Sequence, residues 1–393
     1  MIRFLTAGES HGKCLTVIIE GFPADIALEP EDIDRDLARR QISYGRGKRM
    51  EIETDHVEIT SGVRWGKTLG SPITLIIENK DWINWKAAMS VSAEDSDTIA
   101  PVSRPRPGHA DLPGALKYNQ RDIRAILERA SARETAARVA VGAACKALLK
   151  EFDIRFVSYT KAIGGITADL SGISLSEIVS RVETSDLRCA DEDAARRMKT
   201  RIDEARAQGD TIGGVVEIIA AGIPPGLGSH VHWDRKLDGR IAQSLMSIQA
   251  VKGVEIGLGF ESAERSGSQV HDELFYQPSG EKEGPRRGFY RKTNNAGGIE
   301  GGMSNGEPMV VRCAMKPIAT LMKPLRSVDI LSKQAVEAAV ERSDVCRVPS
   351  LAVIAEAVVA YEVARAFVEK FGGDSLGQIQ SQYRQYWNAL EAF

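Results

Sequence analysis

The 393-residue sequence predicts an α+β fold built from two similar halves. Short apolar runs typical of strands alternate with charged, amphipathic stretches typical of helices. One order of elements also occurs twice: a strand, a helix, a glycine-rich turn ending in proline, and a further strand. The two glycine turns share one spacing, since Gly62, Gly66, Gly70 and Pro72 match Gly298, Gly302, Gly306 and Pro308. This shared frame predicts an internal duplication.

The order of elements divides the chain into two repeated halves with helices between and after them. The first half, about residues 1–120, is expected to contain strands over 1–7, 14–23 and 73–80 and a helix over 29–41. The second half, about 210–330, is expected to contain strands over 215–224 and 309–317 and a helix over 234–247. Connecting helices within 121–209 and C-terminal helices within 331–393 complete a single domain of residues 1–393.

The segments outside the halves carry their own signals. Residues 122–152 read as helical, and Ser131 and Glu134 have the spacing of a capping box. The remaining expected segments are helices over 174–183 and 190–209 (closed by Gly209), a long polar loop over 262–295, and an amphipathic helix over 351–372 that ends at Gly372.

Composition excludes several classes of protein. The formal net charge is −3, and no continuous basic helix is present, which argues against a nucleic-acid partner. No apolar run reaches the roughly 18 residues of a membrane span, and the first ten residues are too short and polar for a secretory signal. Five widely spaced cysteines without a CxxC pair predict reduced thiols, no structural metal site and a cytoplasmic location.

Two of the six histidines lie in unusual surroundings. His11 lies in the turn "GESHG" between two strand-like runs, where glycines allow the side chain to be presented. His109 lies in "SRPRPGHADLPGALKY", whose prolines predict a rigid connector without a helix. Each histidine is therefore a candidate acid or base, and the alternative is a partly buried, hydrogen-bonded residue without chemistry.

Arginines gather in several short segments. The candidates are Arg40, Arg46 and Arg49 in "RRQISYGRGKRM", Arg104 and Arg106 beside His109, Arg129 and Arg133 on one predicted helical face, and Arg342. Arg342 and Asp344 are expected at the end of a helix that begins near Ser332. Together these guanidinium groups predict a cleft for a small ligand with several negative charges. For the pair Arg129 and Arg133, a salt-bridged surface with Glu128 and Glu134 is the alternative. The residues by themselves do not name a reaction.

Eight segments resemble the chorismate synthase family and occur in that family's order. They are "GESHG", "RRQISYGRGKRMEIETD", "SRPRPGHADLPGALKY", "RASARETAARVAVGA", "MSIQAVKGVEIG", "NNAGGIEGG", "MKPIATL" and "ERSDVC". The resemblance implies conversion of 5-enolpyruvylshikimate 3-phosphate to chorismate by anti-1,4-elimination of phosphate, with reduced FMN and no net redox change. It also implies a β-α-β sandwich of two similar halves and a homotetramer. Either NADPH or a separate flavin reductase is implied as the source of reduced flavin.

The resemblance also implies roles for individual residues. The implied catalytic residues are His11 as acid toward the phosphate, His109 beside the reduced flavin, and Asp344 in proton transfer at the flavin. The implied substrate contacts are Ser10, Arg40, Arg46, Arg49, Arg106, Arg133 and Arg342. The implied flavin contacts are Arg40, Arg46, Arg129, Ala130, Ser131, Gln249, Ala250, Gly301, Lys316, Pro317, Ile318, Ala319, Thr320 and Arg342. The substrate's phosphate and two carboxylates explain the number of arginines.

Two other functions remain open at this stage. One is a different flavin-dependent enzyme that acts on a phosphorylated metabolite. The other is a noncatalytic anion-binding protein, which leaves the histidines of "GESHG" and "RPGH" without a purpose. Consumption of reduced nicotinamide in proportion to product would indicate a reductase, whereas ligand binding without turnover would indicate the noncatalytic protein.

Overall fold

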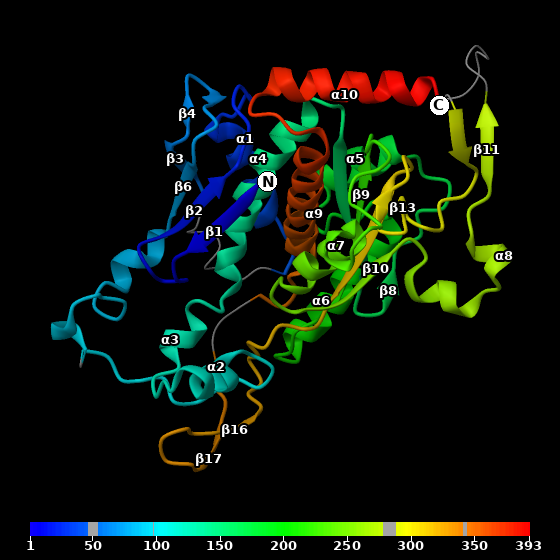
Figure 1. The fold of residues 1–393 in the computed structure, drawn as a ribbon. Helices are drawn as coiled ribbons and strands as arrows, with labels where there is room; N and C mark the ends of the chain where they lie inside the picture. Colours follow the sequence, from blue (N-terminus) through cyan, green and yellow to red (C-terminus); the bar gives the residue numbers. More distant parts are fainter. Residues whose placement is uncertain (46–53, 97, 278–287, 341–343) are drawn as a thin grey trace.

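The computed structural model describes residues 1–45, 54–96, 98–277, 288–340 and 344–393. Two antiparallel β-sheets lie on either side of a layer of helices, which gives a β-α-β sandwich (Figure 1). This arrangement confirms the predicted α+β class. Each sheet buries one face against the helices, as expected for antiparallel sheets.

The first sheet comes from the N-terminal part of the chain. Its strands are β1 (Arg3–Ala7), β2 (Cys14–Glu20), β3 (Val57–Ser61) and β6 (Ile73–Glu78), in the order β1-β2-β6-β3. Alternation decides which side chains face the helices: Val17 and Ile19 of β2 are fully buried, whereas Ile18 between them is 42% exposed. The predicted strands therefore form where the apolar alternation places them.

The second sheet has the same strand order with one strand added. Its members are β7 (Arg155–Ile163), β8 (Ile166–Thr167), β9 (Gly214–Ala221), β10 (Val251–Ile256) and β15 (Met309–Met315), in the order β10-β15-β9-β7-β8. The four strands β7-β9-β15-β10 thus follow the order of β1-β2-β6-β3, with antiparallel neighbours throughout.

Four helices fill the space between the sheets. They are α1 (Pro30–Gln41), α4 (Thr135–Lys150), α7 (Leu237–Met246) and α9 (Val348–Phe371). Helix α4 packs on the first sheet and α9 on the second, and the two helices also pack on each other. They approach closely because small residues line the contact: a Cβ atom at Gly142 would collide with Ala357.

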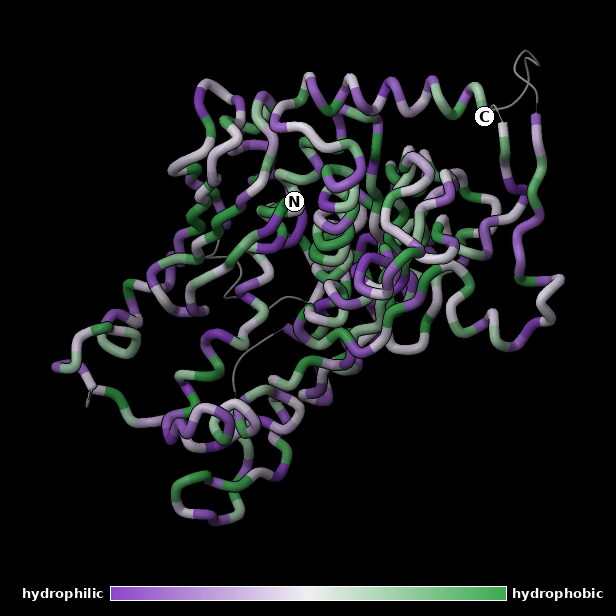
Figure 2. Tube along the Cα trace, in the orientation of Figure 1, coloured by the Kyte–Doolittle hydropathy of each residue, from purple (hydrophilic) through white to green (hydrophobic). Residues whose placement is uncertain are grey.

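Helix α9 is longer and more buried than its sequence pattern predicts. Helix α9 ends before Gly372 as expected, with that glycine at φ +62°. It is buried along most of its circumference and is therefore not amphipathic, because helices and the second sheet cover it from several sides. A separate outer helix, α10 (Leu376–Glu391), carries alternating purple and green residues and buries only Ile379 (Figure 2).

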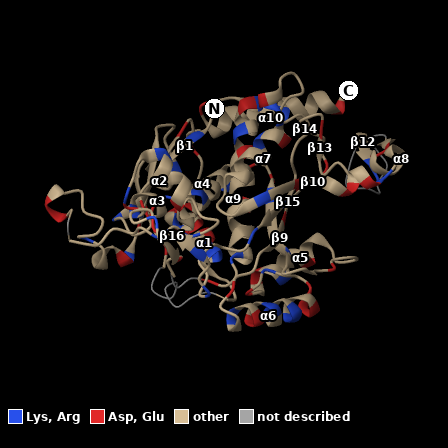
Figure 3. Ribbon diagram, turned by 90° about the horizontal axis from the view of Figure 1, so that it is seen from below, with Lys and Arg blue, Asp and Glu red and all other residues tan. Residues whose placement is uncertain are grey.

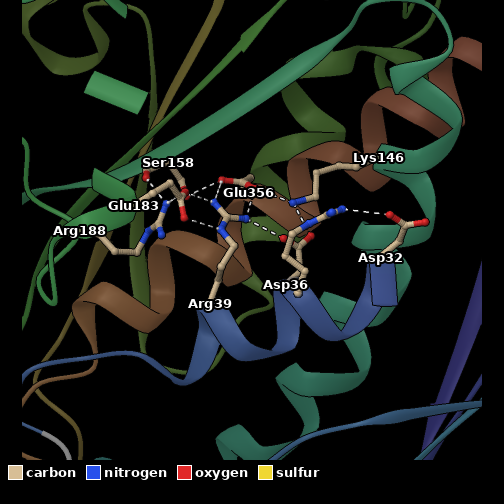
Figure 4. A network of polar contacts seen from close by, with 9 residues as sticks. Asp32, Asp36, Arg39, Lys146, Ser158, Glu183, Arg188 and Glu356 are labelled. Carbon is tan, nitrogen blue, oxygen red and sulfur yellow. Dashed lines mark hydrogen bonds and ion pairs between the residues drawn. The ribbon is translucent and has the colours of Figure 1, made fainter. Parts of the chain in front are cut away.

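A charged network ties the central helices together (Figure 4). The Glu356 carboxylate of α9 accepts hydrogen bonds from Arg39 of α1 at 2.9 Å, Lys146 of α4 at 2.6 Å and Ser158 of β7 at 2.7 Å. Burial by itself raises the pKa of Glu356, but the charges of Lys146 and Arg39 outweigh it and hold the pKa well below its ordinary value. The network fixes α1 and α4, whose ends carry candidate site residues.

Several predicted helices differ from the observed ones. Residues 122–152 are not one helix but α3 (Arg124–Leu127), a 3-10 turn η4 (Ala132–Glu134) and α4. The Ser131 hydroxyl accepts from the Arg133 N–H and caps that turn without the predicted capping box. The helices α5 (Leu175–Thr184) and α6 (Glu192–Ala207) form as predicted, and Gly209 follows α6 at φ +68°.

The expected structures of three further segments, two loops and one helix, are wrong in part. The connector at 103–118 ends in a helix, α2 (Asp111–Tyr118), because Pro113 lies in its first turn, where no N–H is needed. The described part of 262–295 contains α8 (Gly267–Val270) and a hairpin of β11 (Leu274–Gln277) and β12 (Gly288–Arg291). The described part of 332–344 contains no helix. It contains β17 (Ala335–Glu337), which pairs with the preceding strand β16 (Arg326–Val328) in a hairpin.

Short elements complete the fold. They are β4 (Val63–Arg64), β5 (Lys67–Thr68), β13 (Ile299–Glu300), β14 (Met303–Ser304), η2 (Lys80–Asn84), η3 (Ala93–Asp95), η5 (Trp233–Arg235) and η6 (Gly259–Glu264). Basic (blue) and acidic (red) residues alternate along the ribbon of α6, so this helix has no single sign of charge (Figure 3). Among the described residues, none of the helices has the length and apolar character needed to cross a bilayer.

Candidate functional site

His11 lies in the turn between β1 and β2 and is held by a buried carboxylate. Its Nδ1 atom is 2.8 Å from Oε1 of Glu128, and its backbone N–H donates to Oε2 of the same residue at 2.8 Å. The ring of Trp85 covers one face of the imidazole, with the ring centroids 4.1 Å apart. The side chain of His11 keeps only 12% of its surface exposed.

The second ring nitrogen of His11 points away from Glu128. Its Nε2 atom lies 4.0 Å from Oδ2 of Asp81, a side chain that is itself 23% exposed. Asp81 also accepts a hydrogen bond from the indole N–H of Trp85 at 3.1 Å. The imidazole therefore lies between a buried carboxylate at Nδ1 and a more accessible one near Nε2.

The break between α3 and α4 brings Ser131 to the His11 turn. The Ser131 hydroxyl is 3.1 Å from the hydroxyl of Ser10, and the Ser10 N–H donates to the carbonyl of Glu128 at 3.1 Å. In a continuous helix the carbonyl of Glu128 would accept from the N–H four residues later, whereas here it accepts from Ser10. The tertiary contact with the turn thus overrides the local helical pattern.

Arg40 and Arg133 meet at one buried carboxylate. Arg133 reaches Oδ1 of Asp55 at 2.5 Å, and Arg40 reaches Oδ2 at 3.2 Å. Arg133 also donates to the Asn79 side chain at 2.8 Å, and Asn79 holds the carbonyls of Glu9 and Gly12 around His11. Asp55 thus joins two arginines from different segments beside the His11 turn.

Arg129 does not share a helical face with Arg133. Helix α3 ends at Leu127, before both residues, and Arg129 donates to the carbonyls of Gly8 and Thr6 at 3.0 Å each. The predicted surface pairing with Glu128 and Glu134 is also wrong for these arginines. Glu128 binds His11, and Glu134 accepts hydrogen bonds from Thr6, Arg138 and Gln249.

His109 is held by a second buried carboxylate on its own loop. Its Nδ1 atom is 2.5 Å from Oδ1 of Asp111. Arg106 donates to Asp111 through its backbone N–H at 3.0 Å, its Nε at 2.8 Å and its Nη2 at 3.1 Å. Burial raises the pKa of Asp111, but the hydrogen bonds from His109 and Arg106 outweigh it and hold the pKa below its ordinary value.

The predicted flavin segments converge on the His109 loop. The Lys316 ammonium donates to the carbonyl of Gly108, and the backbone N–H of Lys316 donates to the carbonyl of Ala250 at 3.0 Å. Beside Ala250, the Gln249 amide donates to Glu134 at 3.5 Å. Since Glu134 also binds Thr6 at 3.0 Å, this chain of contacts joins the His109 loop to the strand before His11.

The convergence fits a flavin ring. The Oε1 atom of Gln249 is buried and has no hydrogen-bond partner among the described residues. Such an atom costs free energy unless a ligand or water supplies a donor. The isoalloxazine ring of FMN carries an imide N–H of that kind. The adjoining run Lys316 to Thr320 adds a cation and backbone groups to the same place.

Gly301 lies apart from the other predicted flavin contacts. It follows β13, and the next residue, Gly302, accepts from the N–H of Leu237 at the start of α7. Gln249 follows the far end of α7, a helix about 15 Å long at 1.5 Å per residue. A Cβ atom at Gly301 would meet nothing within 4 Å. One copy of the chain therefore does not bring these residues together.

Asp344 is buried, with 5% of its surface exposed, and its carboxylate lies 2.8 Å from Nε of Arg347. The backbone carbonyl of the next residue, Val345, accepts a hydrogen bond from the N–H of Ile212. The Thr211 hydroxyl donates to the backbone carbonyl of Ile318 at 2.8 Å. Asp344 thus connects to the run 316–320 through the segment 211–212. Arg46, Arg49 and Arg342 lie outside the described residues, so their expected roles stay predictions.

Sequence reasoning missed the carboxylates that hold the two histidines. Asp111 follows His109 by two residues, so its spacing was a usable signal. Glu128 is 117 positions from His11 and carries no such signal, and the same is true of Asp55 opposite Arg133. These partners become visible only when the chain folds.

Comparisons with known proteins give one consistent result. The family model for chorismate synthase matches residues 2–368. Chorismate synthases of Geobacter sulfurreducens (59% identical over 393 residues, covering all of both chains) and Pelobacter propionicus (60% over 386 residues, 98% of both) are similar to the chain. A solved crystal structure of chorismate synthase, 45% identical, superposes with a TM-score of 0.80 and covers 100% of this chain and 99% of the other.

Proposed function

The chain belongs to the chorismate synthase family, and on that premise we propose how its residues divide the work of the family's reaction. In that reaction, phosphate leaves 5-enolpyruvylshikimate 3-phosphate by anti-1,4-elimination and chorismate forms. The reaction requires reduced FMN but involves no net redox change. The single observation that carries the assignment of residues is the convergence of Ser10, His11, Arg40 and Arg133 around one turn.

The arginines and Ser10 bind the substrate. Arg40 and Arg133 are gathered at one carboxylate, Asp55, and their guanidinium groups suit the substrate's phosphate and carboxylates. Arg106 contributes from the other loop. Arg46, Arg49 and Arg342 join them by family resemblance. This distribution holds one phosphate and two carboxylates at separate points.

His11 donates a proton toward the leaving phosphate. Negative charge grows on the bridging oxygen as the C–O bond breaks, and a nearby acid lowers the barrier. The proton given up is the Nε2–H of the imidazolium form of His11, since Nδ1 is bonded to Glu128, and the transfer leaves the neutral ring with its remaining proton on Nδ1. Asp81, 4.0 Å from Nε2, occupies the position from which an anionic group would approach.

The flavin binds where Gln249, Ala250 and the run Lys316 to Thr320 meet the His109 loop. Reduced FMN bound there would lend an electron as the bond to phosphate breaks and recover it as the C6 hydrogen leaves, so that no net redox change results. His109 would balance the charge of the reduced ring, and the carboxylate of Asp344 would help the flavin accept the proton from C6. Arg40, Arg46, Arg129, Ala130, Ser131, Gly301 and Arg342 complete the cofactor contacts.

The active assembly is a homotetramer in the cytoplasm. Gly301 lies at the opposite end of α7 from Gln249, which supports a cofactor site completed by a second copy of the chain. All five cysteines are free thiols, which suits a reducing compartment. Reduced FMN comes from NADPH used by the chain itself or from a separate flavin reductase.

The two halves descend from one duplicated unit. The shared strand order of the two sheets supports this, with β7 in the place of β1 and α9 in the place of α4. All six matched glycines have positive φ, between +70° at Gly66 and +89° at Gly306. With this correspondence, the proposed second unit begins near residue 155, at β7, and not near 210.

An anaerobic assay tests the proposed function. Chemically reduced FMN and substrate, without any nicotinamide, should yield phosphate and chorismate one for one. Oxidised FMN alone should yield neither product. Turnover with oxidised FMN and no reductant would contradict the flavin-dependent elimination, and stoichiometric consumption of reduced flavin would indicate a reductase instead. Adding NADPH with oxidised FMN then decides whether the chain reduces its own flavin.

A further inference from the structure

We propose that Glu128 and Asp111 are positioning residues for the reaction. Each holds the Nδ1 atom of one histidine, fixes the orientation and tautomer of its ring, and leaves Nε2 as the nitrogen that acts on the ligand. The inference rests on the proposed roles of His11 and His109, and it assigns functions to two carboxylates outside the expected site.

Glu128 is committed to the His11 turn. Its side chain is 1% exposed, and its two oxygens receive the backbone N–H and the Nδ1 atom of His11, at 2.8 Å each. Its own carbonyl accepts from the N–H of Ser10. The nearest cation recorded for the carboxylate is Arg124, at 4.0 Å. A buried carboxylate of this kind acts mainly through the histidine that it binds.

Asp111 has the same relation to His109 in a different setting. Its side chain is 1% exposed, and Oδ1 lies 2.5 Å from Nδ1 of His109. The other oxygen, Oδ2, accepts both the backbone N–H and the Nε of Arg106. The loop from 106 to 111 is thereby closed around one carboxylate.

A carboxylate at Nδ1 decides which tautomer forms. An ionised carboxylate only accepts hydrogen bonds, so Nδ1 must carry the proton and Nε2 is left for a ligand. In the opposite tautomer, the lone pair of Nδ1 would face a buried anion. Similar carboxylate partners orient working histidines in metal sites and in hydrolytic triads.

Replacing either carboxylate by its amide inverts this preference. In Glu128→Gln, the backbone N–H of His11 favours the amide oxygen at the Oε2 position, so the NH₂ group lies at the Oε1 position, 2.8 Å from Nδ1, and favours a proton on Nε2 although the amide oxygen also stays within 2.9 Å of Nδ1. In Asp111→Asn, the backbone N–H and Nε of Arg106 favour the amide oxygen at the Oδ2 position, so the NH₂ group faces Nδ1 of His109. The Nη2 of Arg106 then loses its acceptor at Oδ1 and has Nδ1 of His109, 3.2 Å away, as an alternative acceptor, which also favours a proton on Nε2.

Two surface pairs provide matched controls. His56 lies 2.9 Å from Asp34, and His232 lies 2.7 Å from Asp234, both through Nδ1. Their histidine side chains are 70% and 61% exposed, so water can replace the lost partner. Asp34→Asn and Asp234→Asn repeat the same chemical change away from the site.

The kinetic experiment uses reduced FMN without air. Glu128→Gln and Asp111→Asn should each lower kcat by about 10²-fold or more, with KM changed only a few-fold. A misoriented or wrongly protonated histidine loses most of its contribution to the rate of the chemical step. The two surface controls should stay within twofold of the parent, and Glu128→Asp should recover part of the loss. In a His11→Ala background, Glu128→Gln should add no further loss, because it acts through that ring.

The second readout is magic-angle-spinning ¹⁵N NMR of ligand-free protein labelled in its histidines. His11 and His109 should carry the proton on Nδ1, and the two amide variants should shift it to Nε2. A proton on Nε2 in the parent protein, or amide variants that keep both tautomer and rate, would overturn the proposal. A changed tautomer with full activity supports the positioning of the rings but contradicts the proposed catalytic roles, so the two failures are distinguishable.

Discussion

His11 and His109 both present Nδ1 to a buried carboxylate, but the chain supplies that carboxylate in opposite ways. For His109, Asp111 comes from two residues along the same loop, and Arg106 shares it. For His11, Glu128 comes from 117 residues away. Among the described residues, the guanidinium group paired with Glu128 is that of Arg124, at 4.0 Å. One arrangement is local and charge-compensated, and the other forms only when α3 reaches the β1–β2 turn.

The difference has consequences for order and for charge. The loop from 106 to 111 contains its own hydrogen bonds, so it can form before the flavin segments reach it. The His11 cluster depends on long-range contacts that close a large loop, and it forms late in any folding sequence. Trp85 adds an aromatic cover to His11 that His109 lacks among the ring contacts of the described residues.

Removal of either imidazole should have the largest effect. His11→Ala and His109→Ala should lower kcat by roughly 10²- to 10⁴-fold with little change in substrate affinity, the usual contribution of a positioned acid. Anaerobic steady-state kinetics with equilibrium binding of substrate measures both quantities. A rate near that of the parent for either variant would leave that histidine with a structural role only.

Asp344 provides the next comparison, because it is a buried carboxylate that lies 2.8 Å from an arginine, Arg347. Asp344→Asn should reduce kcat by about 10²-fold while substrate and FMN still bind, as expected for loss of a proton carrier. Arg347→Gln, which removes the cation 2.8 Å away, is the matched control for a structural ion pair. Loss of FMN binding in Asp344→Asn with kcat intact would make Asp344 a structural partner of Arg347.

The arginines of the two clusters should respond alike. Arg133→Lys and Arg106→Lys keep the charge but lose the planar fork, so each should raise KM by roughly 10-fold with a smaller effect on kcat. Measuring KM at two salt concentrations separates loss of geometry from loss of charge. An Arg106→Lys variant whose thermal stability falls while KM is unchanged would show that Arg106 serves the Asp111 loop alone.

Acid should weaken the local cluster through Asp111. Its pKa is depressed in the folded chain, so its stabilising contribution is complete above its ordinary value of 3.8 and is lost as pH falls below that value. Asp111→Asn should therefore destabilise the protein by about 1–3 kcal/mol at pH 7, with the same deficit at pH 5. The deficit should shrink at pH 3.5. Urea unfolding at the three pH values gives the comparison, and a deficit that grows on acidification would refute it.

Asp81 should have the smallest effect and the opposite sign. It is the anionic group near Nε2 of His11, so it competes with an anionic ligand for that face. Asp81→Asn should tighten substrate binding by about 2- to 5-fold, as expected for removing one partly exposed charge. Isothermal titration with the substrate measures this, and weaker binding would instead make Asp81 a necessary support for Trp85.

Local pattern was enough for much of the fold. The strand at β2, the helix at α1 and the capped helix at α5 form where alternation, proline and capping residues predict them. The expected helical stretch over 122–152 divides near Ser131, which the capping-box spacing marked as one possible helix start, and there the carbonyl of Glu128 accepts from the N–H of Ser10. The amphipathic pattern assigned to α9 fails because neighbours cover the helix on several sides.

By itself, the sequence determined the α+β class, the family, and the histidines and arginines that mark the candidate site. These depend on residue identity and short spacing, which the chain carries directly. Only the tertiary structure decided which carboxylate each histidine contacts. It also decided that Arg129 and Arg133 bind different groups and that Gly301 lies away from Gln249. The physical reason is distance along the chain: no local pattern specifies a contact that forms only when two sheets close around their helices.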